Sequence, residues 1–130
     1  MRTWLKIVSG IAVVAVSFWV TNWALDYWSP PVCSDEARTE LKRPFTKNSG
    51  FAVFSPTPKF SAVSNNPAQP TRSPLKLCED GRLLGAAHVA LQEITEAGKG
   101  RFTHWGDGVF FSASDNSDPN TNGRRYSVGP

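Results

Sequence analysis

The chain has 130 residues and a formal net charge of +3, from 14 Lys and Arg against 11 Asp and Glu. This length allows one small domain with a modest core once a membrane anchor is set aside. Arg2, Lys6 and Asp26 belong to the N-terminal segment, so the charges of the remaining chain nearly balance. Because nucleic-acid binding needs a concentrated positive face, this balance predicts no nucleic-acid partner.

Residues 7–25 carry no charged side chain, and a helix of this length spans about 30 Å of hydrocarbon. Arg2 and Lys6 precede the segment, and Asp26 follows it. Basic residues favour the cytoplasmic side, so this asymmetry places the N-terminus in the cytoplasm. Aromatic side chains, which favour the headgroup layer, stand at both edges. They are Trp4, Trp19, Trp23, Tyr27 and Trp28.

A secretory signal peptide is the alternative explanation of a basic start followed by an apolar run. Its apolar region usually covers only about 7 to 15 residues and ends in small residues. Residues 7–25 are longer and end among tryptophans, with Asn22 and Ala24 as the best approximation to a cleavage site. The pattern therefore favours an uncleaved anchor, and either explanation exports residues 30–130.

These features predict a single-pass membrane protein whose C-terminal domain is periplasmic or extracellular. Pro30 and Pro31 end the anchor helix, since proline cannot continue it. The expected organisation is a cytoplasmic stub and anchor over residues 1–29, a linker over 30–49, and a β-rich domain over 50–130.

The first elements after the anchor are short. Residues 33–43 allow a helix of one or two turns that Pro44 ends. Residues 50–54 and 59–64 are rich in β-branched and aromatic side chains, which predicts a hairpin or two short strands around a Ser-Pro-Thr-Pro turn. Residues 65–74 contain three prolines and no apolar periodicity, so they predict an irregular loop.

The later elements include hairpins and one helix. Asp80-Gly81 supplies the positive φ values of a tight hairpin turn. Residues 86–97 have helical apolar spacing and end at Gly98. Further strands are predicted over residues 101–105, 109–113 and 124–128. The predicted fold is mainly β, a small antiparallel sheet or sandwich with one short helix besides the transmembrane helix, and α+β is the alternative.

Cys33 and Cys78 are the only cysteines, and both lie in the part of the chain predicted to be exported. A cysteine pair in an oxidising compartment predicts a disulfide. Two unpaired thiols are the alternative. The spacing does not match a zinc site.

A polar stretch that reads DNSDPNTNG opens like a calcium-binding loop at Asp118, Asn120 and Asn122. With Asp115, these residues are the candidate calcium ligands. The twelfth position of the motif should be a glutamate, but it is Gly129. A turn that hydrogen-bonds its own backbone explains the same residues, so the turn is favoured and no cofactor is expected.

A second group has the residue types that bind sugars, in which aromatic faces contact C–H groups and polar planar groups bond the hydroxyls. The candidates for glycan or partner binding are His104, Trp105, Asp107, Asn122, Arg124, Arg125 and Tyr126. For Trp105, Phe110 and Phe111 the alternative is a place in the core, which is the usual fate of aromatic residues in so small a domain.

Motifs for catalysis are scarce. Neither G-x-S-x-G nor H-E-x-x-H occurs. A Ser-His-Asp catalytic triad would need the fold to bring together Ser112, His104 and Asp107. His88 lies on the apolar side of the predicted helix, which favours packing over proton transfer. We therefore predict no catalytic residue.

Residues 98–126 contain the segments GRFTHWG and FSASDNSDPNTNGRRY. In these segments the chain resembles a module of uncharacterised bacterial proteins, some of them in settings concerned with surface polysaccharides. The resemblance implies an envelope setting and transfers no catalytic role to any residue. It covers neither the anchor nor the proline-rich middle.

The expected function is that of a membrane-anchored, non-enzymatic envelope module. Its exposed loops, over residues 105–108 and 115–125, would bind a glycan or a partner protein. An enzyme that modifies envelope polysaccharides is one alternative, marked by contact of His104 with Asp107 or Asp115. An accessory subunit of a membrane complex is another.

Overall fold

In the computed structural model, the described residues are Cys33 and residues 38–130. The predicted anchor over residues 7–25 lies outside them. Within the described residues, no helix has the length and apolar character needed to cross a bilayer. Contacts along the chain gather residues 31–130 into one unit.

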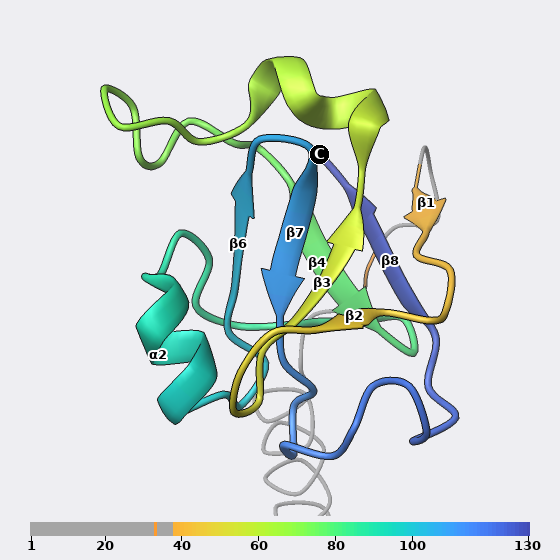
Figure 1. Ribbon diagram of the computed structural model, residues 1–130. Helices are drawn as coiled ribbons and strands as arrows, with labels where there is room; N and C mark the ends of the chain where they lie inside the picture. Colours follow the sequence, from red (N-terminus) through yellow and green to blue (C-terminus); the bar gives the residue numbers. More distant parts are fainter. Residues whose placement is uncertain (1–32, 34–37) are drawn as a thin grey trace, which may run out of the picture. The chain divides into compact units, whose positions relative to one another are not determined.

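The described residues of this unit form eight strands and two short helices (Figure 1). In chain order they are β1 (Thr39–Glu40), β2 (Thr46–Lys47), β3 (Val53–Pro56), the 3₁₀ helix η1 (Pro58–Val63), β4 (Lys76–Glu79), β5 (Arg82–Leu83), α2 (Leu91–Glu96), β6 (Phe102–Trp105), β7 (Gly108–Phe111) and β8 (Tyr126–Gly129). They form two antiparallel sheets of four strands. Sheet A has the order β1-β8-β4-β5, and sheet B has the order β2-β3-β7-β6.

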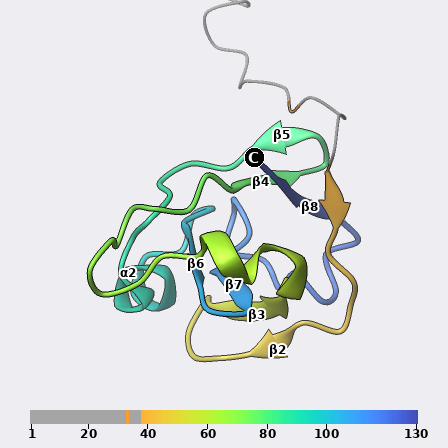
Figure 2. The ribbon, with the colours of Figure 1, turned by 90° about the horizontal axis from the view of Figure 1, so that it is seen from above.

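The core lies between the two sheets, which Figure 2 shows as separate layers. Because side chains alternate along a strand, Val109 and Phe111 of sheet B both point inward and are fully buried. Val128 of sheet A is also fully buried, and the Tyr126 ring lies 5.0 Å from the Phe111 ring. Each such side chain stabilises the fold by about 1.5 to 3 kcal/mol relative to exposure.

The prediction of a mainly β fold is confirmed, and so are its two tightest hairpins. Asp80 and Gly81, with φ of 49° and 77°, join β4 to β5. Positive φ at both central residues is what an Asp-Gly turn of type I′ requires. Gly106, with φ of 55°, begins the two-residue turn from β6 to β7.

Two predictions near the start of the domain are wrong. The second strand, predicted over residues 59–64, is instead η1, because Pro58 fits the first turn of a helix. The helix predicted over residues 33–43 does not form at Thr39–Glu40, because these two residues are strand β1. Their pairing with β8 outweighs a weak local preference for helix. Through β1 and β2, the folded unit begins before residue 50.

The helix predicted over residues 86–97 is confirmed only for Leu91–Glu96. Ala86 and His88 precede it with φ of 47° and 58°, values that a right-handed helix excludes. His88 therefore lies on an irregular segment and not on the apolar side of a helix.

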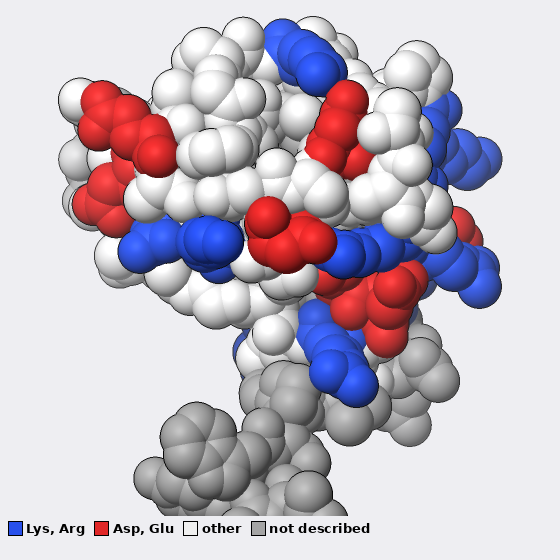
Figure 3. All heavy atoms as spheres, turned by 90° about the horizontal axis from the view of Figure 1, so that it is seen from below, with Lys and Arg blue, Asp and Glu red and all other residues white. Residues whose placement is uncertain are grey.

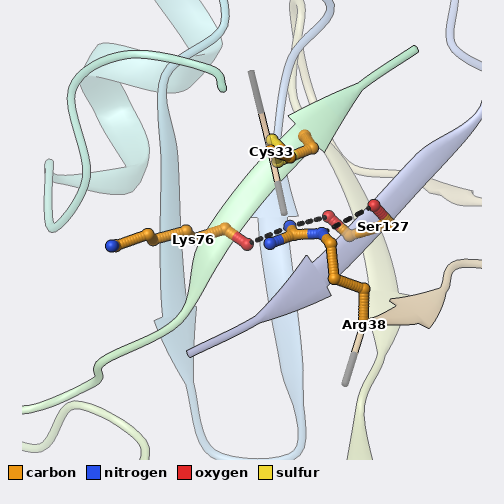
Figure 4. The surroundings of a disulfide bond; sticks show 5 residues. Cys33, Arg38, Lys76 and Ser127 are labelled. Carbon is orange, nitrogen blue, oxygen red and sulfur yellow. Dashed lines mark hydrogen bonds between the residues drawn. A yellow bond between two sulfur atoms is a disulfide. The ribbon is translucent and has the colours of Figure 1, made fainter. Parts of the chain in front are cut away.

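Cys33 and Cys78 form a disulfide that attaches the start of the described chain to β4 (Figure 4). Their Cα atoms are 6.5 Å apart, and the Cys33 N–H also donates to the Gly81 carbonyl at 2.8 Å. Nearby, the Arg38 guanidinium donates to the Ser127 hydroxyl at 3.1 Å, and to the Lys76 carbonyl at 2.8 Å. The predicted pairing of the two cysteines is confirmed.

Candidate functional site

A buried carboxylate organises one end of the domain. Glu79 ends β4 opposite Tyr126, the first residue of β8. Its carboxylate accepts hydrogen bonds from the Tyr126 hydroxyl at 2.9 Å and the Ser114 hydroxyl at 2.6 Å. The Ser114 N–H donates at 3.1 Å and Arg124 at 3.3 Å. Because a buried carboxylate is costly without such donors, these bonds fix the loop between β7 and β8 on sheet A.

Arg124 extends this cluster to the loop surface. Its guanidinium donates two hydrogen bonds of 2.8 Å, one to each oxygen of Asp115. This contact lowers the pKa of Asp115 below its usual value and raises the pKa of Arg124. Burial raises the pKa of Tyr126. At neutral pH, Asp115 and Arg124 are therefore charged and held together, while Tyr126 is neutral.

The candidate calcium ligands Asp118 and Asn120 are each bonded to other protein groups. Asp118 accepts from the Asn120 N–H at 2.9 Å and pairs with Lys47 at 3.1 Å. The Asn120 amide accepts from the Phe45 N–H at 2.7 Å and donates to the Phe45 carbonyl at 3.0 Å. The bond between Asp118 and Asn120 is what the turn explanation predicts, whereas the bonds to Phe45 join distant parts of the chain. In the part of the chain that the structure describes, no three His, Cys, Asp or Glu residues are placed to hold a metal.

Some of the charges on the outside are paired, and both signs are mixed. In Figure 3, basic and acidic side chains intersperse over the face seen from below, without a broad area of one sign. Arg125 pairs with Glu40 at 3.0 Å, and its hydrogen bond is the main reason that the pKa of Glu40 is lowered. Such exposed pairs contribute little stability, but a ligand for Arg125 would have to displace Glu40.

The predicted sugar-binding residues do not form one surface. Trp105 and Asp107 lie at the turn between β6 and β7, and His104 points into the core. The others lie beyond the opposite end of β7, on the loop and at the start of β8 (Figure 1). These are Asn122, Arg124, Arg125 and Tyr126. Asn122 and Tyr126 are brought together, because the Asn122 amide donates to the Tyr126 hydroxyl at 2.8 Å.

The His104 side chain is buried between the two sheets, with 1% of its surface exposed. Its Nδ1 lies 2.7 Å from the Ser73 hydroxyl, and its Nε2 has no hydrogen-bond partner among the described residues. Burial lowers the pKa of His104. The Ser112 hydroxyl instead accepts from the Gly100 N–H at 3.2 Å. Ser112 and His104 thus have separate partners, and the triad geometry is not formed.

The outward side of sheet B carries three aromatic residues, Phe54, Phe110 and Trp105, which we call the aromatic face. They alternate with inward residues on β3, β7 and β6. The Phe54 and Phe110 rings are half-buried, with centroids 4.8 Å apart. Trp105 is 37% exposed and pairs in register with Gly108. A Cβ at Gly108 would collide with the Phe54 ring, so this glycine makes room for the ring beside β7.

Sequence reasoning misses several residues that shape these sites. Alternation around the apolar pair Val109 and Phe111 could have identified Phe110 as outward. No comparable signal marks Glu79 or Ser73, because their partners come from distant parts of the chain.

Comparisons with protein-family models, curated proteins and solved structures find no match to this chain.

Proposed function

We propose that the chain is a membrane-tethered envelope module that binds a glycan on the aromatic face. Residues 7–25 are its anchor, with the N-terminus in the cytoplasm and residues 30–130 outside. The Cys33–Cys78 disulfide supports this location, because such bonds persist in oxidising compartments and are rare in the cytosol.

The observation that carries the binding role is the exposed Trp105 on the same side of sheet B as the half-buried Phe54 and Phe110. Aromatic rings on a rigid sheet can stack against the C–H groups of a sugar with little loss of conformational freedom. Thr46 is exposed and pairs in register with Phe54, so it adds a hydroxyl beside the rings. The three rings and this hydroxyl are uncharged, which suits an uncharged stretch of polysaccharide.

The experiment is a polysaccharide pull-down with the full chain in a zwitterionic nanodisc. We expect Trp105→Ala to weaken retention about tenfold or more, the size of effect typical for a central aromatic contact. Leu91→Ala is the matched control, because Leu91 is equally exposed, at 37%, on α2. Equal retention of the two variants, or no retention of the parent chain, would overturn the binding proposal.

The location is tested separately with a membrane-impermeant thiol reagent applied to intact cells. Cys33, which is partly exposed, should resist the reagent until a reductant that stays outside the cell is added. Labelling only after the cells are lysed and reduced would place the domain inside and refute the envelope location.

A further inference from the structure

A groove opens at the edge of the domain between β1 and the second half of β3. Strand β2 pairs only with Val53 and Phe54, so Ser55 and Pro56 have no strand beside them on that side. The cavity has a volume of about 440 Å³, within the range of small-molecule sites. Its lining includes Leu41, Lys42, Ser55, Thr57, Lys59 and Phe60.

The base of the groove is apolar, and Thr57 closes it with a buried hydroxyl. Leu41 is buried, and Phe60 packs against the core. Thr57 is 4% exposed, and its Oγ1 has no hydrogen-bond partner within the described residues. Thr57 occupies the position before η1 where threonine often caps a helix, yet its side chain makes no capping bond. The Oγ1 atom is itself inaccessible to solvent, so Thr57 closes the base of the groove without offering its hydroxyl to a ligand.

The rim of the groove is basic. Lys42 and Lys59 are both exposed, and neither forms an ion pair with a carboxylate of the described residues. The Lys59 ammonium lies 5.4 Å from the Phe60 ring centroid, so it stands beside the apolar base. Glu40 also lines the groove, but its carboxylate is bound by Arg125.

We infer that this groove binds a single-chain carboxylate amphiphile, such as a fatty acid. The apolar base suits one hydrocarbon chain, while Lys42 and Lys59 complement its acidic head group. The volume is small for a two-chain lipid. A peptide strand is disfavoured, because Pro56 has no N–H with which to extend the sheet. The inference does not depend on glycan binding, since none of the three aromatic-face residues lines the groove.

The test uses the full chain in phosphatidylcholine nanodiscs and a photoreactive dodecanoate, with the labelled peptides mapped by mass spectrometry. We expect labels within residues 39–42 and 55–60. Lys42→Gln and Lys59→Gln should each reduce labelling about two- to fivefold, as for loss of an exposed ion pair. Lys99→Gln is the matched control, because Lys99 is exposed and outside the groove. The corresponding photoreactive alcohol should label more weakly than the acid.

Thr57→Val tests whether the apolar character of the base matters for binding. This change keeps the shape of the side chain and replaces the buried, unpaired hydroxyl with a methyl group. We expect labelling to stay equal or rise, and the Tm without ligand to stay the same or rise. A fall in labelling at an unchanged Tm would mean that binding depends on the hydroxyl and not on an apolar base, and it would overturn the inference. Labels outside the groove, equal labelling by the alcohol, or displacement only by a two-chain lipid would overturn it as well.

Discussion

The Tyr126 hydroxyl meets the Glu79 carboxylate at 2.9 Å, where the paired ends of β8 and β4 lie inside the domain. Because Glu79 also bonds Ser114 and Arg124, Glu79→Gln replaces one acceptor oxygen by an NH₂ group that faces donors. We expect the free energy of unfolding to fall by about 2 to 4 kcal/mol. Urea denaturation of the full chain measures this.

Glu93→Gln is the control for this change, because Glu93 is exposed on α2. It should alter the free energy of unfolding by less than about 0.5 kcal/mol. Similar losses for both variants would contradict a structural role for the Glu79 cluster.

His104 makes stability depend on pH. Burial lowers the pKa of His104 below the ordinary histidine value of 6.5, so the folded state favours the neutral imidazole. As the pH falls below about 6.5, the unfolded chain takes up a proton more readily than the folded chain. The free energy of unfolding should therefore decrease from pH 7 to pH 5. In His104→Leu this decrease should shrink, and an identical pH profile in the variant would argue against the effect.

Gly108 tests how tightly the aromatic face is packed. A Cβ at this position would collide with the Phe54 ring and lie 2.6 Å from the Ser55 carbonyl oxygen. Gly108→Ala should lower the free energy of unfolding by about 1 to 3 kcal/mol, as overpacking does. A methyl group at Gly85 would meet no other atom within 4 Å, so Gly85→Ala serves as the control with little effect. Thermal melts that rank the two variants in the opposite order would show that the Phe54 ring moves freely.

The disulfide closes a long loop, with a sequence separation of 45 residues. Loss of this constraint should lower the free energy of unfolding by about 3 to 4.7 kcal/mol. The double variant Cys33→Ala and Cys78→Ala should match the reduced parent chain in guanidinium titrations. A double variant as stable as the oxidised parent would mean that the bond adds nothing to the fold.

The hairpins follow from local chemistry, which is why the sequence predicts them. Asp80-Gly81 can adopt the positive φ values of its turn without help from distant residues. Strand β1 has no such signal, because its two residues become a strand only through pairing with β8. For η1 the signal is local, because Pro58 fits the first turn of a helix, but the β-branched and aromatic residues after it predict a strand.

The candidate sites show a similar division. The residue types in the loop over 115–125 predict turns, and their backbone bonds agree with that. The sequence could not predict that the β6–β7 turn and the loop over residues 115–125 lie apart in the fold. Trp105 and Arg125 are both residue types that bind sugars, so the sequence groups them, but strand β7 separates them in the fold. The groove depends on where β2 stops pairing with β3, which no local pattern marks.

The covalent bond between Cys33 and Cys78 also determines how the domain responds to mechanical tension. If the chain is pulled from its two ends, the force passes from Cys33 directly into β4 and on towards residue 130. Strands β1 to β3 and η1 lie inside the covalent loop and stay off that path. An oxidised molecule stretched to full extension would therefore be shorter than a reduced one by the length of that loop.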